Sequence, residues 1–267
     1  FNAPIKTYEA YNLVLMENTH GISFQQGATN TYTVGGGVKS TTSGDFEFTI
    51  DTLNHMASST QVTAAGYKYK NHDASYNEAA PHAEAWAGRS AVGNKVENNK
   101  LSVTGGTISA AAYGGLVKNN KLDAHGNPLP TGDAEKNIIA VSGGNVANAY
   151  GAMLHTKNGN AAANSAEIAG GTVGSVYGAS LAAVGATGTA DKSKVTISGG
   201  SVTGDVHGGH IANATATGHI TNSEVNITGG SVGGTIYGGD NAGTGAAKDN
   251  VLNLYGGSVT GDVYGGH

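Results

Sequence analysis

The chain carries a glycine-rich unit that recurs six times between residues 99 and 267. Each copy begins with Asn or Ser, alternates polar with apolar residues up to a Gly-Gly pair, and continues into a second apolar segment that ends in Tyr-Gly or His-Gly. The second glycines of the pairs lie 27 to 38 residues apart: Gly106, Gly144, Gly171, Gly200, Gly230 and Gly257. A repeat of this period is typical of solenoids, in which one supersecondary unit stacks on the next.

The spacing of apolar residues within a copy is that of β-strands. In the fourth copy, Val195 and Ile197 alternate with polar residues, and Val202 and Val206 follow the Gly-Gly pair. Two short strands joined by a glycine corner cannot bury their apolar face alone, whereas identical coils stacked about 4.8 Å apart bury it against one another. The sequence therefore predicts an all-β fold, a parallel β-helix or β-solenoid. We expect right-handed coils, the general rule for parallel crossovers.

Stacking places equivalent residues of successive copies in columns. The residue six positions before each Gly-Gly pair is always polar, and we expect a hydrogen-bonded structural ladder of Asn99, Asn137, Asn164, Ser193, Ser223 and Asn250. The residue before the closing Gly gives an aromatic column of Tyr113, Tyr150, Tyr177, His207, Tyr237 and Tyr264. This column is either a stack that packs the coils or a stripe that faces a ligand. We favour packing, the usual role of registered aromatics in a repeat.

The repeat divides the chain into three parts. Residues 99–267 form the repeat β-helix of six coils, which we expect to be truncated at its C-terminal end, and residues 61–98 form a transitional coil with a long loop from Asn71 to Arg89. Residues 1–60 lack the Gly-Gly unit but keep strand-like alternation, as in Phe46 to Ile50. Because the open strand edges of a stack need a cover, we expect irregular first coils or an N-terminal β cap there.

Composition excludes several classes of function. Charged residues make up only 12% of the chain, the formal net charge is −5 and Arg89 is the only arginine, so the chain offers no basic surface for nucleic acid. The absence of cysteine excludes a disulfide framework, a thiol nucleophile and thiolate metal sites. No run of about 18 apolar residues occurs, so we expect no membrane-spanning helix.

Catalytic and metal chemistry find little support in the sequence. Polysaccharide-degrading β-helix enzymes need clustered carboxylates, but Asp205 and Asp262 share a register only across an intervening copy with Thr235, which favours polar turn residues. His207 and His210 form a His-x-x-His motif, and His267 matches His210 in register two coils later, with Asp240 between them. These groups could catch a metal, yet we favour surface histidines. We therefore expect no enzyme, no metal and no cofactor.

The copies at residues 195–209 and 225–239, Val-Thr-Ile-Ser-Gly-Gly-Ser-Val-Thr-Gly-Asp-Val-His-Gly-Gly and Val-Asn-Ile-Thr-Gly-Gly-Ser-Val-Gly-Gly-Thr-Ile-Tyr-Gly-Gly, resemble the glycine-rich repeats of autotransporter passenger domains of Gram-negative bacteria. The resemblance implies a type V secreted adhesin at the bacterial cell surface, exported through the outer membrane and anchored there by a barrel that this chain does not contain. It supplies no catalytic residue that can be placed on this chain.

These arguments lead to a surface-displayed or secreted β-helical adhesin, in which loops on a rigid stalk attach to host or other bacterial cells. The partner would be a host cell-surface protein, a glycan or another bacterium. The candidate contact residues are Tyr76, His82 and Trp86 in the transitional coil, and Pro128, Leu129, Pro130 and Thr131 in the longest insertion. Trp86 could instead plug the start of the core. The alternative function is a self-associating structural filament or matrix protein, and a polysaccharide-degrading enzyme is less favoured.

Overall fold

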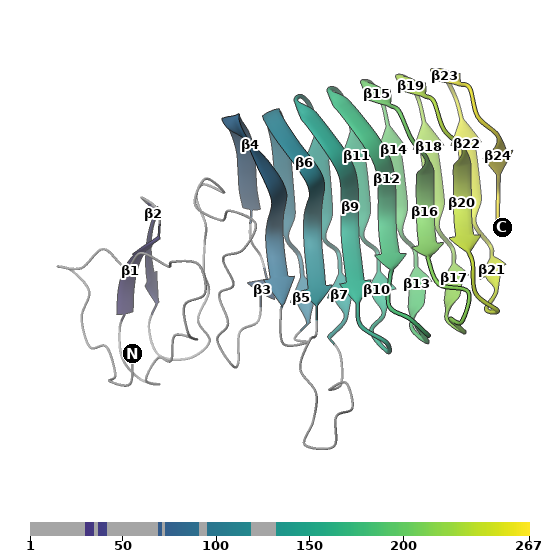
Figure 1. Ribbon diagram of the computed structural model, residues 1–267, viewed down its shortest axis with the longest axis horizontal. Helices are drawn as coiled ribbons and strands as arrows, with labels where there is room; N and C mark the ends of the chain where they lie inside the picture. Colours follow the sequence, from purple (N-terminus) through teal and green to yellow (C-terminus); the bar gives the residue numbers. More distant parts are fainter. Residues whose placement is uncertain (1–29, 35–36, 42–68, 71–72, 91–94, 119–131) are drawn as a thin grey trace.

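The computed structural model describes residues 30–34, 37–41, 69–70, 73–90, 95–118 and 132–267 (Figure 1). An antiparallel hairpin joins β1 (Asn30–Val34) and β2 (Gly37–Thr41), and all other strand pairs of these residues are parallel. The described residues contain strands stacked as a β-solenoid, which confirms the predicted all-β parallel β-helix. No helix with the length and apolar character to cross a bilayer occurs among them. The hairpin lies within the predicted cap, whose remaining residues lie outside the described part.

Each coil contributes strand segments to two parallel sheets. The smaller sheet has seven short strands: β3 (Tyr69–Lys70), β5 (Val96–Glu97), β7 (Ala134–Glu135), β10 (Ala161–Ala162), β13 (Thr189–Asp191), β17 (His219–Thr221) and β21 (Ala247–Lys248). In the larger sheet, the strands that precede the Gly-Gly pair are β8 (Ile138–Val141), β11 (Ser165–Ile168), β14 (Lys194–Ile197), β18 (Glu224–Ile227) and β22 (Val251–Leu254).

The strands after the Gly-Gly pair complete the larger sheet. They are β9 (Asn145–His155), β12 (Thr172–Leu181), β15 (Ser201–Val202), β16 (Val206–Ile211), β19 (Ser231–Val232), β20 (Ile236–Asn241), β23 (Ser258–Val259) and β24 (Val263–Tyr264). In the first two coils, β4 (Asp73–Ser90) and β6 (Lys100–Lys118) run through the corner without interruption. Figure 1 shows the coils following one another along the long axis in chain order.

The core consists of aliphatic columns in register. Ala166 lies between Ile139 and Val195 of the neighbouring coils, as the repeat alignment predicts. One buried cluster fills the space between the strands before and after the Gly-Gly pair, and a second cluster packs the smaller sheet against the end of the long strands. Each fully buried Val, Ile or Leu contributes roughly 1.5–3 kcal/mol. The alternating residues that the sequence assigned to the interior are thus the residues that hold the coils together.

The two glycines at each corner are required for different reasons. The second glycine has a positive φ, between 75° for Gly200 and 83° for Gly257, which a side chain with a Cβ adopts only under strain. The first glycine lies against the preceding coil: a Cβ at Gly199 would lie 2.5 Å from the carbonyl oxygen of Ala169. Conformation and close approach together explain why neither position varies among the six copies.

A second tight turn, which the sequence analysis did not identify, precedes the polar ladder. The residue directly before each Asn or Ser of the ladder has a left-handed backbone with φ between 51° and 57°: Asn98, Lys136, Ala163, Lys192, Asn222 and Asp249. Asn and Asp tolerate this conformation better than Ala or Lys. Because the side chains at this position are so different, the shared backbone geometry leaves no clear signal in the sequence.

The prediction of a long loop between Asn71 and Arg89 is wrong. Residues 73–90 form β4, which pairs in parallel with β6 and adds one more coil before the six copies. The pairing shifts at three points between Tyr76 and Glu84, where the segment has no Gly-Gly pair to make the usual corner. The insertion with Pro128 lies outside the described residues.

Candidate functional site

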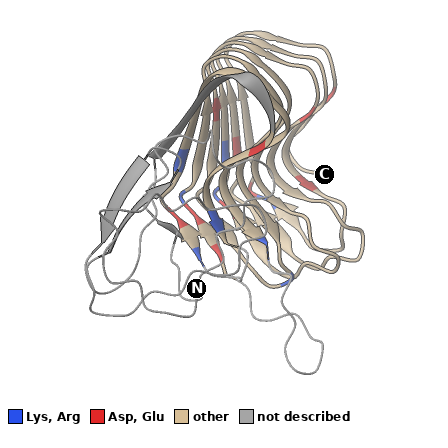
Figure 2. Cartoon of the chain, turned by 60° about the vertical axis from the view of Figure 1, so that its left-hand side comes forward, with Lys and Arg blue, Asp and Glu red and all other residues tan. Residues whose placement is uncertain are grey.

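The strand that follows each Gly-Gly corner contains a bend. Residues three apart in a straight strand point to opposite faces and lie about 10 Å apart. The ring centroids of His207 and His210 nevertheless lie only 4.7 Å apart, so the strand bends at Gly208 and Gly209 with both rings on its concave side. The long strands curve in the same way along the stack (Figure 2). We call this concave outer strip the outer bend.

Two columns of side chains line the outer bend. The aromatic column consists of Trp86, Tyr113, Tyr150, Tyr177, His207, Tyr237 and Tyr264, and the bend column, three residues later in each coil, consists of Arg89, Leu116, Met153, Ser180, His210, Asp240 and His267. The bend column is apolar at Leu116 and Met153 and polar from Ser180 onward. The outer bend therefore changes character along the stack.

The rings of the aromatic column stack face to face between coils. From Tyr113 onward, successive centroids lie 5.3, 4.5, 4.8, 5.0 and 5.4 Å apart, with interplanar angles of 18° or less. This is the arrangement that the packing interpretation predicts. Tyr113 and His207 are buried, whereas Tyr150, Tyr177 and Tyr237 are half-buried. Since neighbouring rings cover the faces, only ring edges and hydroxyls of the half-buried residues reach solvent.

Trp86 is not the exposed contact residue that the sequence analysis proposed. It is only 2% exposed and lies opposite Tyr113, so that it begins the aromatic column. It packs in an outer cluster with Tyr113 and Leu116, separate from the two clusters inside the coils. The guanidinium carbon of Arg89 lies 4.6 Å from the Trp86 ring, a cation–π contact. The core alternative is thus correct for burial, but Trp86 lies on the outer bend rather than inside the coil.

An ion pair crosses the outer bend at this apolar end. The Lys118 ammonium lies 3.7 Å from Oε1 of Glu84, and the Tyr113 hydroxyl donates a hydrogen bond of 3.4 Å to the same oxygen. Burial, together with the negative charge of Glu84, raises the pKa of Tyr113. The phenol therefore remains a neutral hydrogen-bond donor at neutral pH.

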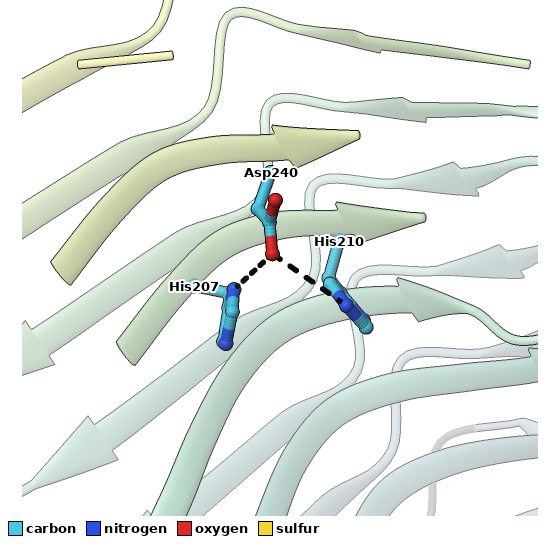
Figure 3. A group of neighbouring side chains, drawn as sticks. All are labelled: His207, His210 and Asp240. Atoms are coloured by element: carbon cyan, nitrogen blue, oxygen red, sulfur yellow. Dashed lines mark ion pairs between the residues drawn. The ribbon is translucent and has the colours of Figure 1, made fainter. Parts of the chain in front are cut away.

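At the polar end, two histidines and an aspartate gather from two neighbouring coils (Figure 3). His207 Nδ1 lies 3.2 Å and His210 Nε2 3.7 Å from Oδ2 of Asp240. The three ligand atoms all lie within 4.8 Å of one another. On the other carboxylate oxygen, His267 Nδ1 lies 3.3 Å from Oδ1. The expectation of surface histidines is wrong for His207, whose side chain is only 6% exposed.

The electrostatics of this cluster keep its members in different charge states. Burial, with the neighbouring His207 ring, lowers the pKa of His210 to about 4, so this imidazole is neutral at neutral pH. Burial disfavours the charged form of Asp240, but the approach of His207 and the nearby His210 outweigh that effect, and the pKa of Asp240 lies below its usual value. The cluster thus offers a carboxylate beside a neutral imidazole.

The polar ladder is hydrogen-bonded in its first half. Asn99 Nδ2 donates to Oδ1 of Asn137 at 2.8 Å, and Asn137 Nδ2 donates to Oδ1 of Asn164 at 3.0 Å. The next two members are serines, and the buried hydroxyls of Ser193 and Ser223 have no hydrogen-bond partner. The last member, Asn250, accepts a bond of 2.9 Å from the Ser223 backbone N–H through its Oδ1, but its Nδ2 has no partner. The ladder therefore serves the structure, most strongly in the first three copies.

The other predicted contact residues are not brought into a site. The backbone of Tyr76 and of His82 lies in β4, opposite Val103 and Ile108, but their side chains lie outside the described part of the chain. Pro128, Leu129, Pro130 and Thr131 also lie outside the described residues. These residues remain predictions.

Sequence reasoning named the residues of the histidine–aspartate cluster as groups that could catch a metal but favoured surface histidines, and the reason is physical. Strand alternation places His207 and His210 on opposite faces, and only the bend at the intervening glycines reverses this. Two features of the sequence could have indicated the cluster: His207 replaces the Tyr of the other copies, and the bend column beside it is polar from Ser180 onward.

Comparison of the chain with family models, curated proteins and solved structures gives no match.

Proposed function

We propose that the chain is the rigid β-helical rod of a surface-displayed or secreted bacterial adhesin of the autotransporter type. The observation that supports this function is the regular stack of parallel coils, joined by strand pairing and buried columns from β4 to β24. A solenoid of this kind grows by adding coils, so it can hold a binding surface away from the cell. The repeats at residues 195–239 supply the family resemblance.

The two carboxylates that share a register, Asp205 and Asp262, make contacts typical of turns, which favours a structural role over a catalytic one. Oδ1 of Asp205 accepts a hydrogen bond of 2.7 Å from the Thr235 backbone N–H, and Oδ2 of Asp262 lies 3.4 Å from the Tyr264 hydroxyl. Glycoside hydrolysis needs a pair of carboxylates that converge on one bond. In our proposal, these aspartates stabilise turns between coils.

The outer bend is the surface that we assign to contact with the partner. Its half-buried tyrosines, such as Tyr177, expose edges and hydroxyls rather than ring faces. Such a surface suits a partner that forms hydrogen bonds, a protein loop or the hydroxyls of a glycan, better than a sugar ring stacked on an aromatic face. Tyr76, His82 and residues 128–131 remain additional contact candidates.

The test is attachment of beads coated with the 267-residue chain to cultured host cells, to other bacteria and to a glycan array. We expect saturable attachment that Tyr177→Phe weakens, because this change removes a hydroxyl but keeps the stack. Tyr113→Phe is the matched control, since Tyr113 is only 4% exposed. Deletion of Asn127 to Thr131 tests the insertion separately.

Failure to attach to any of these surfaces would overturn the proposal. Light scattering on the same preparation distinguishes the alternative function: concentration-dependent polymers without attachment would favour a structural filament. Attachment that no variant changes would retain the adhesin but refute the outer bend as its contact surface.

A further inference from the structure

His207 is an unusual member of the aromatic column. Its ring stacks between Tyr177 at 4.8 Å and Tyr237 at 5.0 Å, nearly parallel to both. Nδ1 approaches Asp240 but lacks the alignment of a hydrogen bond, so it is a buried nitrogen without a hydrogen-bond partner. Leaving such a group unpartnered is costly, and tyrosine occupies this position in the other five copies. The histidine therefore calls for an explanation other than packing.

The unpartnered nitrogen points into a set of ligand atoms. Metal ions such as Zn²⁺ bind imidazole nitrogen and carboxylate oxygen at about 2.0–2.2 Å, which places neighbouring ligand atoms of a tetrahedron about 3.3–3.6 Å apart. The distances of 3.2 and 3.7 Å from His207 Nδ1 and His210 Nε2 to Asp240 Oδ2 are close to this range. The remaining separation, between the two imidazole nitrogens, is at most 4.8 Å, so metal binding requires the half-buried His210 side chain to move toward His207.

The surroundings hold the rings in an orientation suited to a metal. The Ser180 hydroxyl lies 3.2 Å from His210 Nδ1, and Ser180 is only 2% exposed. In the tautomer with the proton on Nδ1, the Nδ1–H group donates a hydrogen bond to this hydroxyl, and the lone pair of Nε2 faces Asp240 (Figure 3). Such a hydrogen bond on the second ring nitrogen is the usual companion of a metal-bound histidine. The stack with Tyr177 and Tyr237 fixes the other ring.

We propose that His207, His210 and Asp240 bind one divalent transition-metal ion of the zinc class. Two imidazoles and one carboxylate suit Zn²⁺ and its neighbours better than Ca²⁺ or Mg²⁺, which take oxygen ligands. The ion joins the coil that contains both histidines to the coil that contains Asp240. The remaining coordination position is open to water or to a ligand atom of a partner. This inference does not depend on adhesion.

The site is tested by calorimetric titration of the metal-stripped full chain with ZnCl₂. We expect saturation near one equivalent of zinc with no comparable binding of Mg²⁺ or Ca²⁺, and Co²⁺ should give the visible absorption bands of a tetrahedral site. His207→Tyr should weaken zinc binding at least about tenfold, while it restores the residue type that the column uses elsewhere. His155→Asn, a histidine change on the same outer surface but outside the cluster, is the control and should leave zinc binding unchanged.

Several outcomes would overturn the inference. They are unchanged zinc affinity in His207→Tyr, an equal loss in His155→Asn, or equal binding of Mg²⁺. Far-UV circular dichroism of each variant verifies that the fold is retained. If His207→Tyr does not fold, Asp240→Asn provides the second test, because it keeps the side-chain shape but removes the charged ligand. Zinc affinity that survives this change would equally refute the site.

Discussion

Replacement of Asn137 by alanine tests whether the polar ladder stabilises the stack through hydrogen bonds. Asn137 is fully buried and its Nδ2 donates two bonds of 3.0 Å, to Oδ1 of Asn164 and to the Val96 carbonyl. Its Oδ1 accepts bonds of 2.8 Å from Asn99 Nδ2 and of 3.3 Å from the Asn99 backbone N–H. Alanine removes all four bonds. At about 0.5–1.5 kcal/mol per bond, we expect the free energy of unfolding to fall by about 2–6 kcal/mol.

Ser193→Ala is the matched control for this prediction. Ser193 occupies the same column and is fully buried, but its hydroxyl has no hydrogen-bond partner. Its removal should therefore change the free energy of unfolding by less than about 1 kcal/mol, or raise it, because a buried unpartnered hydroxyl is lost. The two variants separate the effect of hydrogen bonding from the effect of a buried position in the ladder.

The measurement combines urea unfolding, followed by circular dichroism, with hydrogen exchange of amides in β8 and β11. Exchange is needed because coils of a solenoid can open separately, so a single midpoint can hide a local effect. Asn137→Ala should speed exchange in these strands far more than in β18. If Asn137→Ala costs no more than Ser193→Ala, the hydrogen-bonded ladder is not a source of stability and the reasoning fails.

Three further changes follow from the geometry. Ala163→Gly should raise the free energy of unfolding by about 0.5–1 kcal/mol, because Ala163 has φ of 53°, whereas Ala169→Gly, outside the left-handed region, should lower it, both by urea titration. Burial alone would raise the pKa of Asp191, but hydrogen bonds from Asn222 and Thr221 hold it below the usual 3.8. The stability that these bonds confer is present above pH 3.8 and is lost as the pH falls through the lower pKa of the folded state. Asp191→Asn should therefore reduce the fall of the urea midpoint at acid pH. Zinc should raise the melting temperature of the unchanged chain, because it binds the folded state, and His207→Tyr should lose this rise; an equal rise in the variant would contradict the site.

The repeat made the architecture predictable because each local preference agrees with the global fold. Alternation, the Gly-Gly corner and the recurring Asn or Ser all specify the same coil, and the registers in the structure follow the sequence alignment, as in Val195 opposite Val225. Before the six copies, the sequence predicts a transitional coil but assigns the residues of β4 to a loop, because Asn77 and Glu78 stand where the next coil has Gly105 and Gly106. The Gly-Gly pair is the most specific sequence signal of a coil, and β4 lacks it.

The outer bend could not be derived from periodicity. A period of two describes a straight strand, and it assigns Trp86 and Arg89 to opposite faces although the bend brings the guanidinium over the ring. The burial of Trp86 follows from the same bend, because the outer cluster needs a concave surface to exclude water. Side chains outside the solenoid interior, such as Trp86, are therefore buried because the strands bend, and the spacing of apolar residues in the sequence does not predict that bend.

Deviations from a column indicate function only when they converge. Ser193 departs from the Asn of the first three copies and leaves a buried hydroxyl unpartnered, yet no ligand-bearing side chain gathers around it in the described clusters. His207 departs from the aromatic column in the same coil in which the bend column has become His210, and Asp240 follows in the next coil. A stack selected for packing alone would gain nothing from changing two facing columns together. These substitutions coincide on the outer bend, where the two columns lie side by side. Because the ladder at Ser193 shows no such coincidence, we infer a metal site only at His207, where it accounts for the buried nitrogen without a hydrogen-bond partner.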